Sequence, residues 1–177
     1  ESLESALERN TNIYAEVLGG NINSGGQRNG GTMTAPNSEA VQKCIVDALK
    51  NSNVKSSDID YINGHLTASK KDPVEIENWT IALQRKGKKF PIINSLKSMV
   101  GHCLAGSGAI ENVATILQLK HQFVFPNINC KKVHPDILKL ISKEKIPTQF
   151  TPKKLNIIAK ASFGFGDVNG CVIFKKY

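Results

Sequence analysis

Short apolar segments alternate with amphipathic helical segments along this chain, and this alternation constrains the fold more than any other feature. The pattern predicts strands near residues 13–18, 59–63, 91–95, 156–162 and 169–175. It predicts helices near residues 37–52, 73–86 and 104–120. Strands that alternate with helices are typical of an α/β sheet, and the last two strands are close enough to form an antiparallel hairpin. No repeat or linker divides the 177 residues, so we expect one domain.

The predicted helix near residues 104–120 differs from the other two. It leaves little polar surface on any side, and a helix that is apolar almost all round is buried almost all round. Its apolar residues are Ala105, Ala109, Ile110, Val113, Ala114, Ile116, Leu117 and Leu119. In contrast, the stretch from Gly19 to Thr34 is rich in glycine, asparagine and serine, and we expect a loop there.

Composition narrows the function classes. The formal net charge is +8, but the basic residues form short clusters without interleaved aromatics, so we expect no nucleic-acid partner. A basic surface could instead steer an acidic protein partner, and composition does not choose between that role and simple solvation. No run of 18 or more apolar residues is present, so we expect no membrane partner.

The four cysteines form no CxxC pair, which favours reduced thiols and a cytoplasmic protein. A metal site would combine His102, Cys103, Cys130 and His134, but their spacing matches no familiar zinc signature. We therefore expect neither a metal ion nor a cofactor.

Three segments each follow a predicted strand and carry polar or glycine residues. They run from Asn63 to Ser69, from Lys97 to His102 and from Ser162 to Gly166. Ligands bind at the carboxyl ends of strands in α/β sheets. If these strands are neighbours, two histidines, a lysine and a Phe-Gly turn converge on one pocket. Each segment alone has a plain structural explanation, so the residues by themselves predict only a pocket with two histidines.

The same three segments resemble known motifs. NGHLTAS (residues 63–69), KSMVGHCLAGSGAIE (97–111) and ASFGFGDVNG (161–170) are similar to the sequence signatures of β-ketoacyl synthases, in that family's order and spacing. The similarity covers essentially the whole chain and identifies it with the C-terminal half of these condensing enzymes, which belong to the thiolase superfamily.

The resemblance implies half of a thiolase-like α/β fold: a mixed sheet with helices on both faces and a central buried helix. Residues 1–177 would be one C-terminal domain, with residues 1–24 finishing or linking from an N-terminal half. The complete enzyme would be a homodimer that works with an acyl carrier protein.

The resemblance also implies an acyltransferase. Its reaction is the decarboxylative Claisen condensation of an acyl thioester with malonyl-acyl carrier protein, in fatty-acid or polyketide synthesis. By their match to the family motifs, the catalytic residues are His65, His102 and Lys97, and Glu75 supports the lysine. The Phe165 backbone completes an oxyanion hole, and its ring gates the acyl pocket. The substrate arm is bound by Thr67, Ser69 and Phe163.

Several residues depart from the family pattern. Leu66 replaces a small residue and would crowd the pantetheine entrance, and Asp167 adds a negative charge after the Phe-Gly turn. Many members bind a monovalent cation near the position of Lys160. The resemblance thus implies a candidate ion site at Asn63, Glu111 and Lys160, and our hypothesis is that the Lys160 ammonium, paired with Glu111, replaces the cation.

None of the four cysteines has the setting of the family's nucleophile, which lies in the first half. We therefore expect no condensation by this chain alone. One alternative is a non-catalytic partner subunit that resembles chain-length factors, but such relatives often lose the residues that are retained here. A degradative thiolase is another alternative, although the Phe-Gly turn lacks that family's second cysteine.

Overall fold

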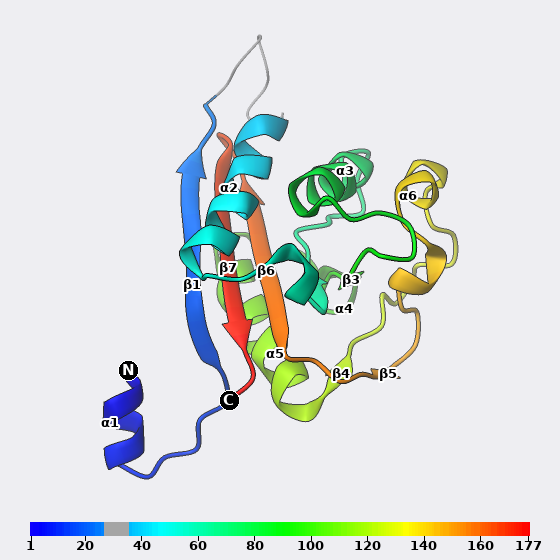
Figure 1. The fold of residues 1–177 in the computed structure, drawn as a ribbon. Helices are drawn as coiled ribbons and strands as arrows, with labels where there is room; N and C mark the ends of the chain where they lie inside the picture. The colour runs from blue at the N-terminus through cyan, green and yellow to red at the C-terminus, as the bar shows by residue number, and fades with distance from the viewer. Residues whose placement is uncertain (27–35) are drawn as a thin grey trace.

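The computed structural model describes residues 1–26 and 36–177 and contains a five-stranded mixed sheet in the order β1-β7-β6-β2-β3 (Figure 1). The strands are β1 (Glu16–Ser24), β2 (Tyr61–Asn63), β3 (Ile92–Asn94), β6 (Ile157–Gly164) and β7 (Val168–Lys175). Strands β1, β7 and β6 pair antiparallel, and β6, β2 and β3 pair parallel. The closing hairpin is therefore confirmed. A second, two-stranded sheet joins β4 (Phe123–Val124) to β5 (Thr151–Pro152).

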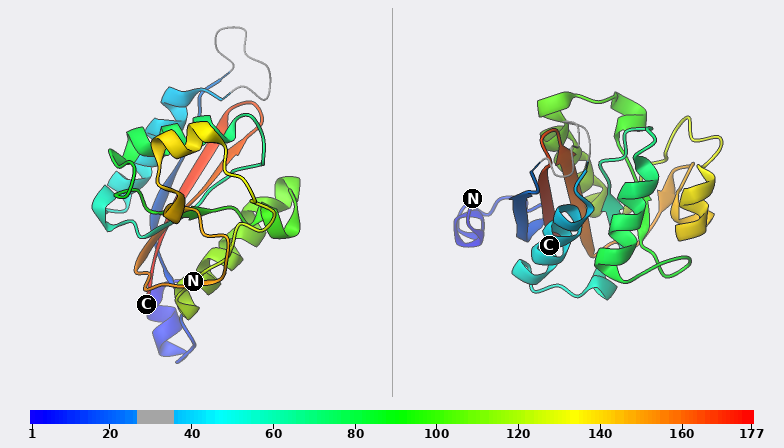
Figure 2. Two further views of the ribbon diagram at one scale, coloured as in Figure 1. Left: turned by 90° about the vertical axis from the view of Figure 1, so that its right-hand side faces the viewer. Right: turned by 90° about the horizontal axis from the view of Figure 1, so that it is seen from above.

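Helices cover both faces of the large sheet (Figures 1 and 2). Helices α2 (Ser38–Asn51) and α3 (Asp72–Leu83) lie on one face, and α5 (Ser107–His121) lies on the other. The shorter helices are α1 (Leu3–Glu8), α4 (Lys97–Val100) and α6 (Pro135–Leu140), with 3-10 turns at Ser56–Asp58, Leu104–Gly106 and Lys143–Lys145. In the described part of the chain, none of these helices has the length and apolarity needed to cross a bilayer.

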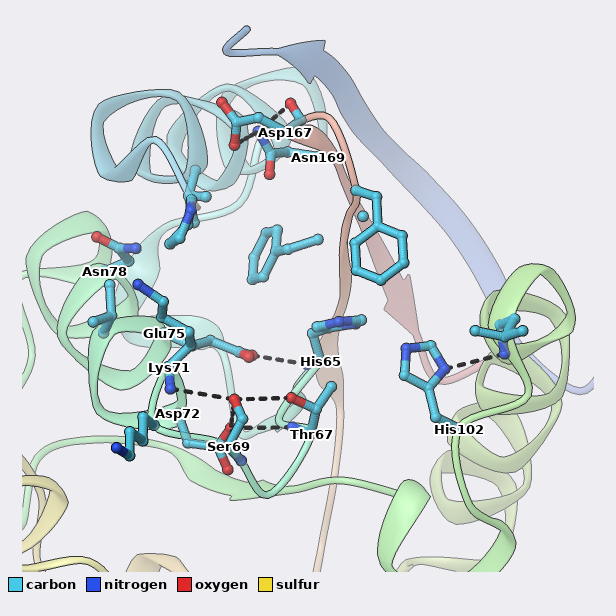
Figure 3. A pocket seen from close by; sticks show the side chains of 18 residues that line it. His65, Thr67, Ser69, Lys71, Asp72, Glu75, Asn78, His102, Asp167 and Asn169 are labelled. Carbon is cyan, nitrogen blue, oxygen red and sulfur yellow. Dashed lines mark hydrogen bonds between the residues drawn. The ribbon is translucent and has the colours of Figure 1, made fainter. Parts of the chain in front are cut away.

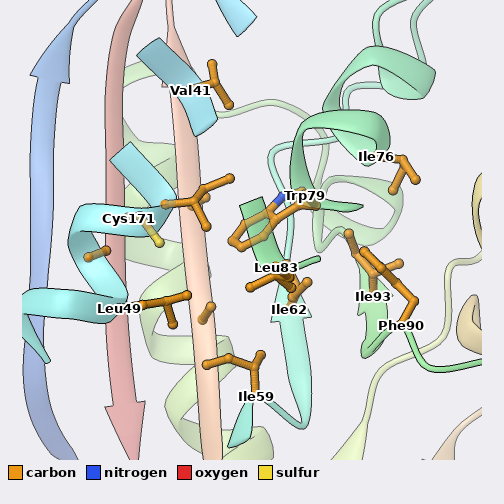
Figure 4. Close-up of a cluster of buried hydrophobic side chains, with 14 of the residues drawn as sticks. Val41, Leu49, Ile59, Ile62, Ile76, Trp79, Leu83, Phe90, Ile93 and Cys171 are labelled. Atoms are coloured by element: carbon orange, nitrogen blue, oxygen red, sulfur yellow. The ribbon is translucent and has the colours of Figure 1, made fainter. Parts of the chain in front are cut away.

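The main core lies between the sheet and helices α2 and α3 (Figure 4). Trp79, Phe90 and Ile45 are fully buried there. Because successive strand residues point to opposite faces, Ile62 packs into this core while its neighbour Tyr61 packs into a smaller cluster beside α5. Both faces of the central strands are thus buried, which explains their nearly continuous apolar sequence.

Helix α5 is buried on the face that packs against the sheet, whereas its opposite face is exposed in this chain. Its buried face is largely polar and includes Ser107, Glu111, Thr115 and Gln118. Its apolar residues Ile110, Val113 and Leu117 are 41%, 60% and 36% exposed. The reason is that one layer packs on α5 within the described residues, and this layer presents polar groups. The Gln118 amide, for example, donates to the buried Tyr61 hydroxyl at 3.0 Å.

Strand β1 corrects the loop expected from Gly19. Residues 19–24 pair antiparallel with β7, so pairing between distant segments overrides a glycine-rich composition. Gly20 allows a close approach, because a Cβ there would lie 2.5 Å from the Cys171 carbonyl oxygen. The rest of the expected loop, residues 27–34, lies outside the described residues. Residues 16–24 belong to this sheet, and the linking role expected for residues 1–24 stays a prediction.

Two neighbouring residues of α2 test this packing. Ile45 is 0% exposed and Val46 is 45% exposed. Replacing Ile45 with Ala should lower the free energy of unfolding by about 2–5 kcal/mol, because it removes buried contacts and leaves a cavity. Val46→Ala should change it by no more than about 0.5 kcal/mol. Urea denaturation measures both values, and equal losses would contradict the orientation of α2.

Candidate active site

The three predicted segments meet at one edge of the sheet, where they enclose a cavity of about 450 Å³ (Figure 3). Both histidines line it, and the centroids of the His65 and His102 rings are 5.5 Å apart in an edge-on arrangement. Phe163 and Phe165 line the same cavity, and the Phe163 ring lies 6.3 Å from that of His65. The predicted convergence of two histidines with the Phe-Gly turn is confirmed.

The topology explains this convergence. Strands β2, β3 and β6 run parallel, with Asn63 in register with both Asn94 and Lys160. Parallel strands place their carboxyl ends at the same edge of a sheet. The segments that follow β2 and β3 and the end of β6 therefore meet there, although they are far apart in the sequence.

Two carboxylates in the first turn of α3 hold the loop that carries His65. The oxygens of Glu75 accept hydrogen bonds from the backbone N–H groups of His65 at 2.7 Å and Leu66 at 2.8 Å. The carboxylate of Asp72 accepts from the N–H groups of residues 67, 68 and 69 at 3.1, 3.1 and 3.2 Å. The two carboxylates thus hold the N–H groups of five consecutive residues, 65–69. Both lie in the first turn of the helix, where the helix dipole favours negative charge.

These contacts correct the role expected of Glu75, which holds the His65 loop rather than Lys97. A buried carboxylate on a helix binds the N–H groups that the fold brings next to it. The sequence alone does not show whether these belong to a backbone loop or to a lysine. Burial raises the pKa of Glu75 to about 7, although the two backbone hydrogen bonds oppose the shift. The sequence interpretation missed Asp72 as a site residue. The signal was present in the two acidic residues at the start of a helix that follows the His65 loop.

Lys97 is buried beside the cavity but does not line it. Its ammonium group forms an ion pair with Glu111 Oε1. The other Glu111 oxygen, Oε2, lies 2.8 Å from Nζ of Lys160. The three side chains are 6%, 1% and 3% exposed, and we call them the Lys-Glu-Lys triad. The expected pairing of Lys160 with Glu111 is confirmed, and Glu111 also supplies the support for Lys97 that was expected of Glu75.

Oxygen atoms surround the Lys160 ammonium on several sides. Besides its ion pair with Glu111, it donates to the Ala161 carbonyl oxygen at 2.9 Å and to the Ser162 hydroxyl. Burial lowers the pKa of Lys160, and the neighbouring Glu111 opposes this shift. These residues do not fit a bound monovalent cation, because the ammonium already occupies the space between the oxygens. Asn63, expected at the same ion site, instead donates to the Tyr61 hydroxyl at 3.1 Å.

The two imidazoles are set up as neutral hydrogen-bond donors. Burial, together with the nearby charge of Lys97, lowers the pKa of His65 to about 4. The Nδ1 atom of His102 accepts from the Leu104 N–H at 3.1 Å and lies 3.0 Å from the Ser107 hydroxyl. An Nδ1 that accepts a backbone N–H cannot carry the ring proton of a neutral imidazole, so that proton is on Nε2.

The remaining predicted residues lie around the cavity wall. The hydroxyls of Thr67 and Ser69 line it and are hydrogen-bonded to each other at 3.1 Å. Phe165 stands at the rim and is 63% exposed. Leu66, expected to crowd the pantetheine entrance, packs against the main core and is not part of this cavity wall. It does line an adjoining cavity of about 770 Å³, together with Thr67, Ser69 and His102.

None of the four cysteines lines this cavity in the described residues. Cys44 and Cys171 are buried, and burial raises the pKa of both thiols. Cys130 is half-buried, and burial raises its pKa as well. Cys103 is exposed, and its sulfur lies 3.8 Å from the Val100 carbonyl oxygen. No thiol therefore lines the cavity that both histidines share, whereas Cys130 lines an adjoining cavity whose wall also includes His102.

Residues 14–131 match the family described as Beta-ketoacyl synthase, C-terminal domain. All of the chain is 36% identical to 40% of 3-oxoacyl-acyl-carrier-protein synthase 1 of Buchnera aphidicola subsp. Baizongia pistaciae. Similarly, 99% of the chain is 32% identical to 40% of 3-oxoacyl-acyl-carrier-protein synthase 1 of Escherichia coli strain K12. The chain thus spans about two fifths of the length of these relatives.

A solved structure agrees with the sequence comparisons. Its title describes a type II PKS acyl-carrier protein in complex with its ketosynthase bound to the hexaketide. The similarity covers 100% of this chain and 42% of the chain in that structure, with a TM-score of 0.85 and 31% sequence identity. Family match, relatives and fold all agree. The chain belongs to the β-ketoacyl synthase family and corresponds to its C-terminal domain.

Proposed function

We propose that this chain supplies the histidine and lysine half of the active site of a β-ketoacyl-acyl carrier protein synthase. The observation that carries the proposal is the edge-on pair of imidazoles, 5.5 Å apart, on the wall of one cavity beside the Phe-Gly turn. A buried ammonium–carboxylate pair, Lys97 with Glu111, lies near enough for both charges to act on the pKa of His65. Because the chain spans about two fifths of its relatives, the activity belongs to a longer protein that contains it.

In the first step, a malonyl thioester loses its terminal carboxylate as carbon dioxide. The C–C bond breaks, and its electron pair becomes an enolate whose negative charge lies on the thioester oxygen. His65 and His102 donate N–H hydrogen bonds to that oxygen, because donors fixed in advance stabilise charge that develops in the transition state. The low pKa of His65 supports this role, since the ring is neutral at ordinary pH.

In the second step, the enolate carbon attacks the carbonyl carbon of an acyl thioester on a cysteine of the N-terminal half. A new C–C bond forms, the carbonyl oxygen becomes an oxyanion, and its collapse expels the cysteine thiolate. The backbone N–H of Phe165 stabilises that oxyanion, and the exposed ring gates the acyl pocket. Phe165 suits this role because it lies on the cavity wall, at the tip of the turn between β6 and β7.

The Lys-Glu-Lys triad carries one net positive charge beside the histidines. Lys97 and Lys160 both lower the pKa of His65, whereas Glu111 raises it. Burial is the largest cause of the lowered pKa of His65, and the two lysines add to it. The triad also favours negative charge on the substrate. Lys160 takes the place of a monovalent cation, because its ammonium is held by the oxygens of Glu111, Ala161 and Ser162.

The substrate arm is the phosphopantetheine of an acyl carrier protein. Thr67 and Ser69 offer hydroxyls on the cavity wall, where Phe163 offers an apolar surface. The similar ketosynthase crystallised with its acyl-carrier protein supports this choice of partner. The formal charge of +8 suits an acidic partner. By analogy with the family, the complete enzyme works as a homodimer.

Removal of either histidine tests the catalytic role. In the full-length protein, His65→Ala and His102→Ala should each lower the rate of malonyl decarboxylation about 100- to 1,000-fold, as expected for the loss of one oxyanion donor. His121→Ala, an exposed histidine at the end of α5, serves as the matched control and should keep the wild-type rate. Carbon dioxide release from malonyl-acyl carrier protein measures all three. Unchanged rates in both site variants would favour a non-catalytic partner subunit.

The charges around His65 predict a graded change in its titration. Lys97→Met should raise the pKa of His65 from about 4 towards its ordinary value, and Lys160→Met should raise it less, because Lys97 is the larger of the two charge effects. Lys139→Met, on the surface helix α6, should leave the pKa unchanged. NMR titration of the imidazole resonances measures each value. A reversed order of Lys97 and Lys160 would contradict the assigned electrostatics.

The placement of the thiols predicts that this chain alone does not take up an acyl group. Incubated with short, medium or long acyl-coenzyme A, it should keep its unmodified intact mass and show no condensation with malonyl-acyl carrier protein. The physical reason is that two thiols are buried and none lines the cavity of the histidines. A stoichiometric acyl adduct on any of the four cysteines, detected by mass spectrometry, is the contrary result.

A further inference from the structure

Asp167 is the last residue of the turn that carries Phe165, and it is buried in the cavity wall, with 4% exposure. Its φ is 63° and that of the preceding Gly166 is 73°, so two successive residues have left-handed backbone. They close the short loop between β6 and β7, whose flanking residues Gly164 and Val168 pair with each other. The position of Asp167 therefore fixes the direction in which the turn projects over the cavity.

The Asp167 carboxylate sits at the start of helix α2. Its Oδ1 accepts a hydrogen bond from the backbone N–H of Asn37 at 3.1 Å. Asn37 is the N-cap of this 14-residue helix, and its own side chain accepts from the Ala40 N–H at 3.4 Å. No lysine, arginine or histidine in the described residues forms an ion pair with Asp167. Oδ1 also accepts from the Asn169 side-chain amide at 3.4 Å, and Oδ2 has no hydrogen-bond partner among the described residues. One backbone donor, one side-chain donor and the positive end of the helix therefore face the carboxylate.

The end of strand β1 is bound to the same point. The Asp167 carbonyl oxygen accepts from the Gly25 N–H at 2.9 Å, and the Asn37 side chain donates to the Gly25 carbonyl oxygen at 3.2 Å. From β7, the Asn169 side chain donates to the Asp167 carbonyl oxygen at 3.2 Å and to Asn23 at 3.1 Å. The turn, the start of α2 and the end of β1 are therefore joined through one residue.

Gly25 is matched to this carboxylate. A Cβ at position 25 would lie 1.7 Å from Oδ2 of Asp167 and 2.6 Å from the Ala40 Cβ. No side chain fits there while the Asp167 carboxylate is in place. The Asp167 carboxylate fills the space that a side chain at position 25 would need. Substitutions at the two positions should therefore not act independently of each other.

We propose that Asp167 is a positioning residue that fastens the Phe163–Gly166 turn to the start of α2 and thereby sets where Phe165 stands at the cavity rim. The attachment itself follows from contacts within this chain. Its consequence for acyl substrates rests on the proposed function, in which Phe165 gates the acyl pocket.

The attachment is tested by amide hydrogen exchange on the full-length protein. Asp167→Gly suits the left-handed backbone but removes the carboxylate, and Asp167→Asn keeps the shape without the charge. The amides of Asn37 and of residues 164–168 should exchange about tenfold faster in Asp167→Gly, and by a smaller factor in Asp167→Asn. The matched control, Asp136→Asn, removes an exposed carboxylate from the first turn of α6 and should leave these amides unchanged. Unchanged exchange in Asp167→Gly would overturn the proposal.

A double-variant comparison sharpens this test. Gly25→Ala should speed the exchange of the same amides, because the methyl group displaces the carboxylate. When it is combined with Asp167→Gly, the two effects should be less than multiplicative, because the methyl group then has no carboxylate to displace, although it still meets the Ala40 Cβ. Fully multiplicative effects would show that the two residues act independently, contrary to the proposal.

Kinetics then separate positioning from a general loss of structure. In the full-length enzyme, Asp167→Gly should raise KM for the acyl donor several-fold and keep kcat for malonyl decarboxylation within about twofold. A structural defect would lower both activities together by reducing the folded fraction, and that result would overturn the gating role. If the wild-type protein condenses no acyl group at all, the proposed function fails, whereas the exchange experiment still decides whether Asp167 holds the turn.

Discussion

The buried Glu111 carboxylate, shared by the ammonium groups of Lys97 and Lys160, is the interaction on which the rest of the site depends. Burying each of these charges costs several kcal/mol, and pairing offsets the cost only while the geometry is kept. The three residues come from α4, α5 and β6, so moving any one of these elements would leave a charge buried without its partner. The same requirement explains why α5 turns polar residues towards the sheet, because its carboxylate must reach Lys160 within β6 and Lys97 at the start of α4.

Much of the arrangement could be predicted from the sequence, because it follows from local rules. Strand and helix periodicity predicted an α/β sheet, and the closing hairpin followed from two adjacent strands around a glycine-rich turn. The meeting of His65 with His102 was predictable for a topological reason. Both histidines follow parallel strands, and such strands end at one edge. The position of Phe163 at the same edge follows in turn from the pairing of β6 with β2.

Other features could not be predicted, because they depend on contacts between distant segments. Residues 19–24 have a loop-like composition but become a strand by pairing with β7. Glu75 and Glu111 are both acidic residues on helices, and only the three-dimensional placement shows that the first holds a loop while the second holds two lysines. Leu66 packs against the main core, a contact that its neighbours in sequence do not reveal. Likewise, the exposed apolar residues of α5 were indistinguishable from core residues by composition.

The opposite shifts of Glu75 and His65 have a consequence for how the fold responds to acid. Glu75 is protonated up to about pH 7 in the folded state but only up to its ordinary value of 4.5 when unfolded, so between these limits stability falls as pH rises. His65 is deprotonated down to about pH 4 in the folded state but only down to 6.5 when unfolded, so there stability rises with pH. Over the range that the two windows share, one group releases a proton on unfolding while the other takes one up. Burying both groups therefore adds almost no net proton linkage to the folding equilibrium. Through these two residues, mild acidification leaves the free energy of unfolding almost unchanged.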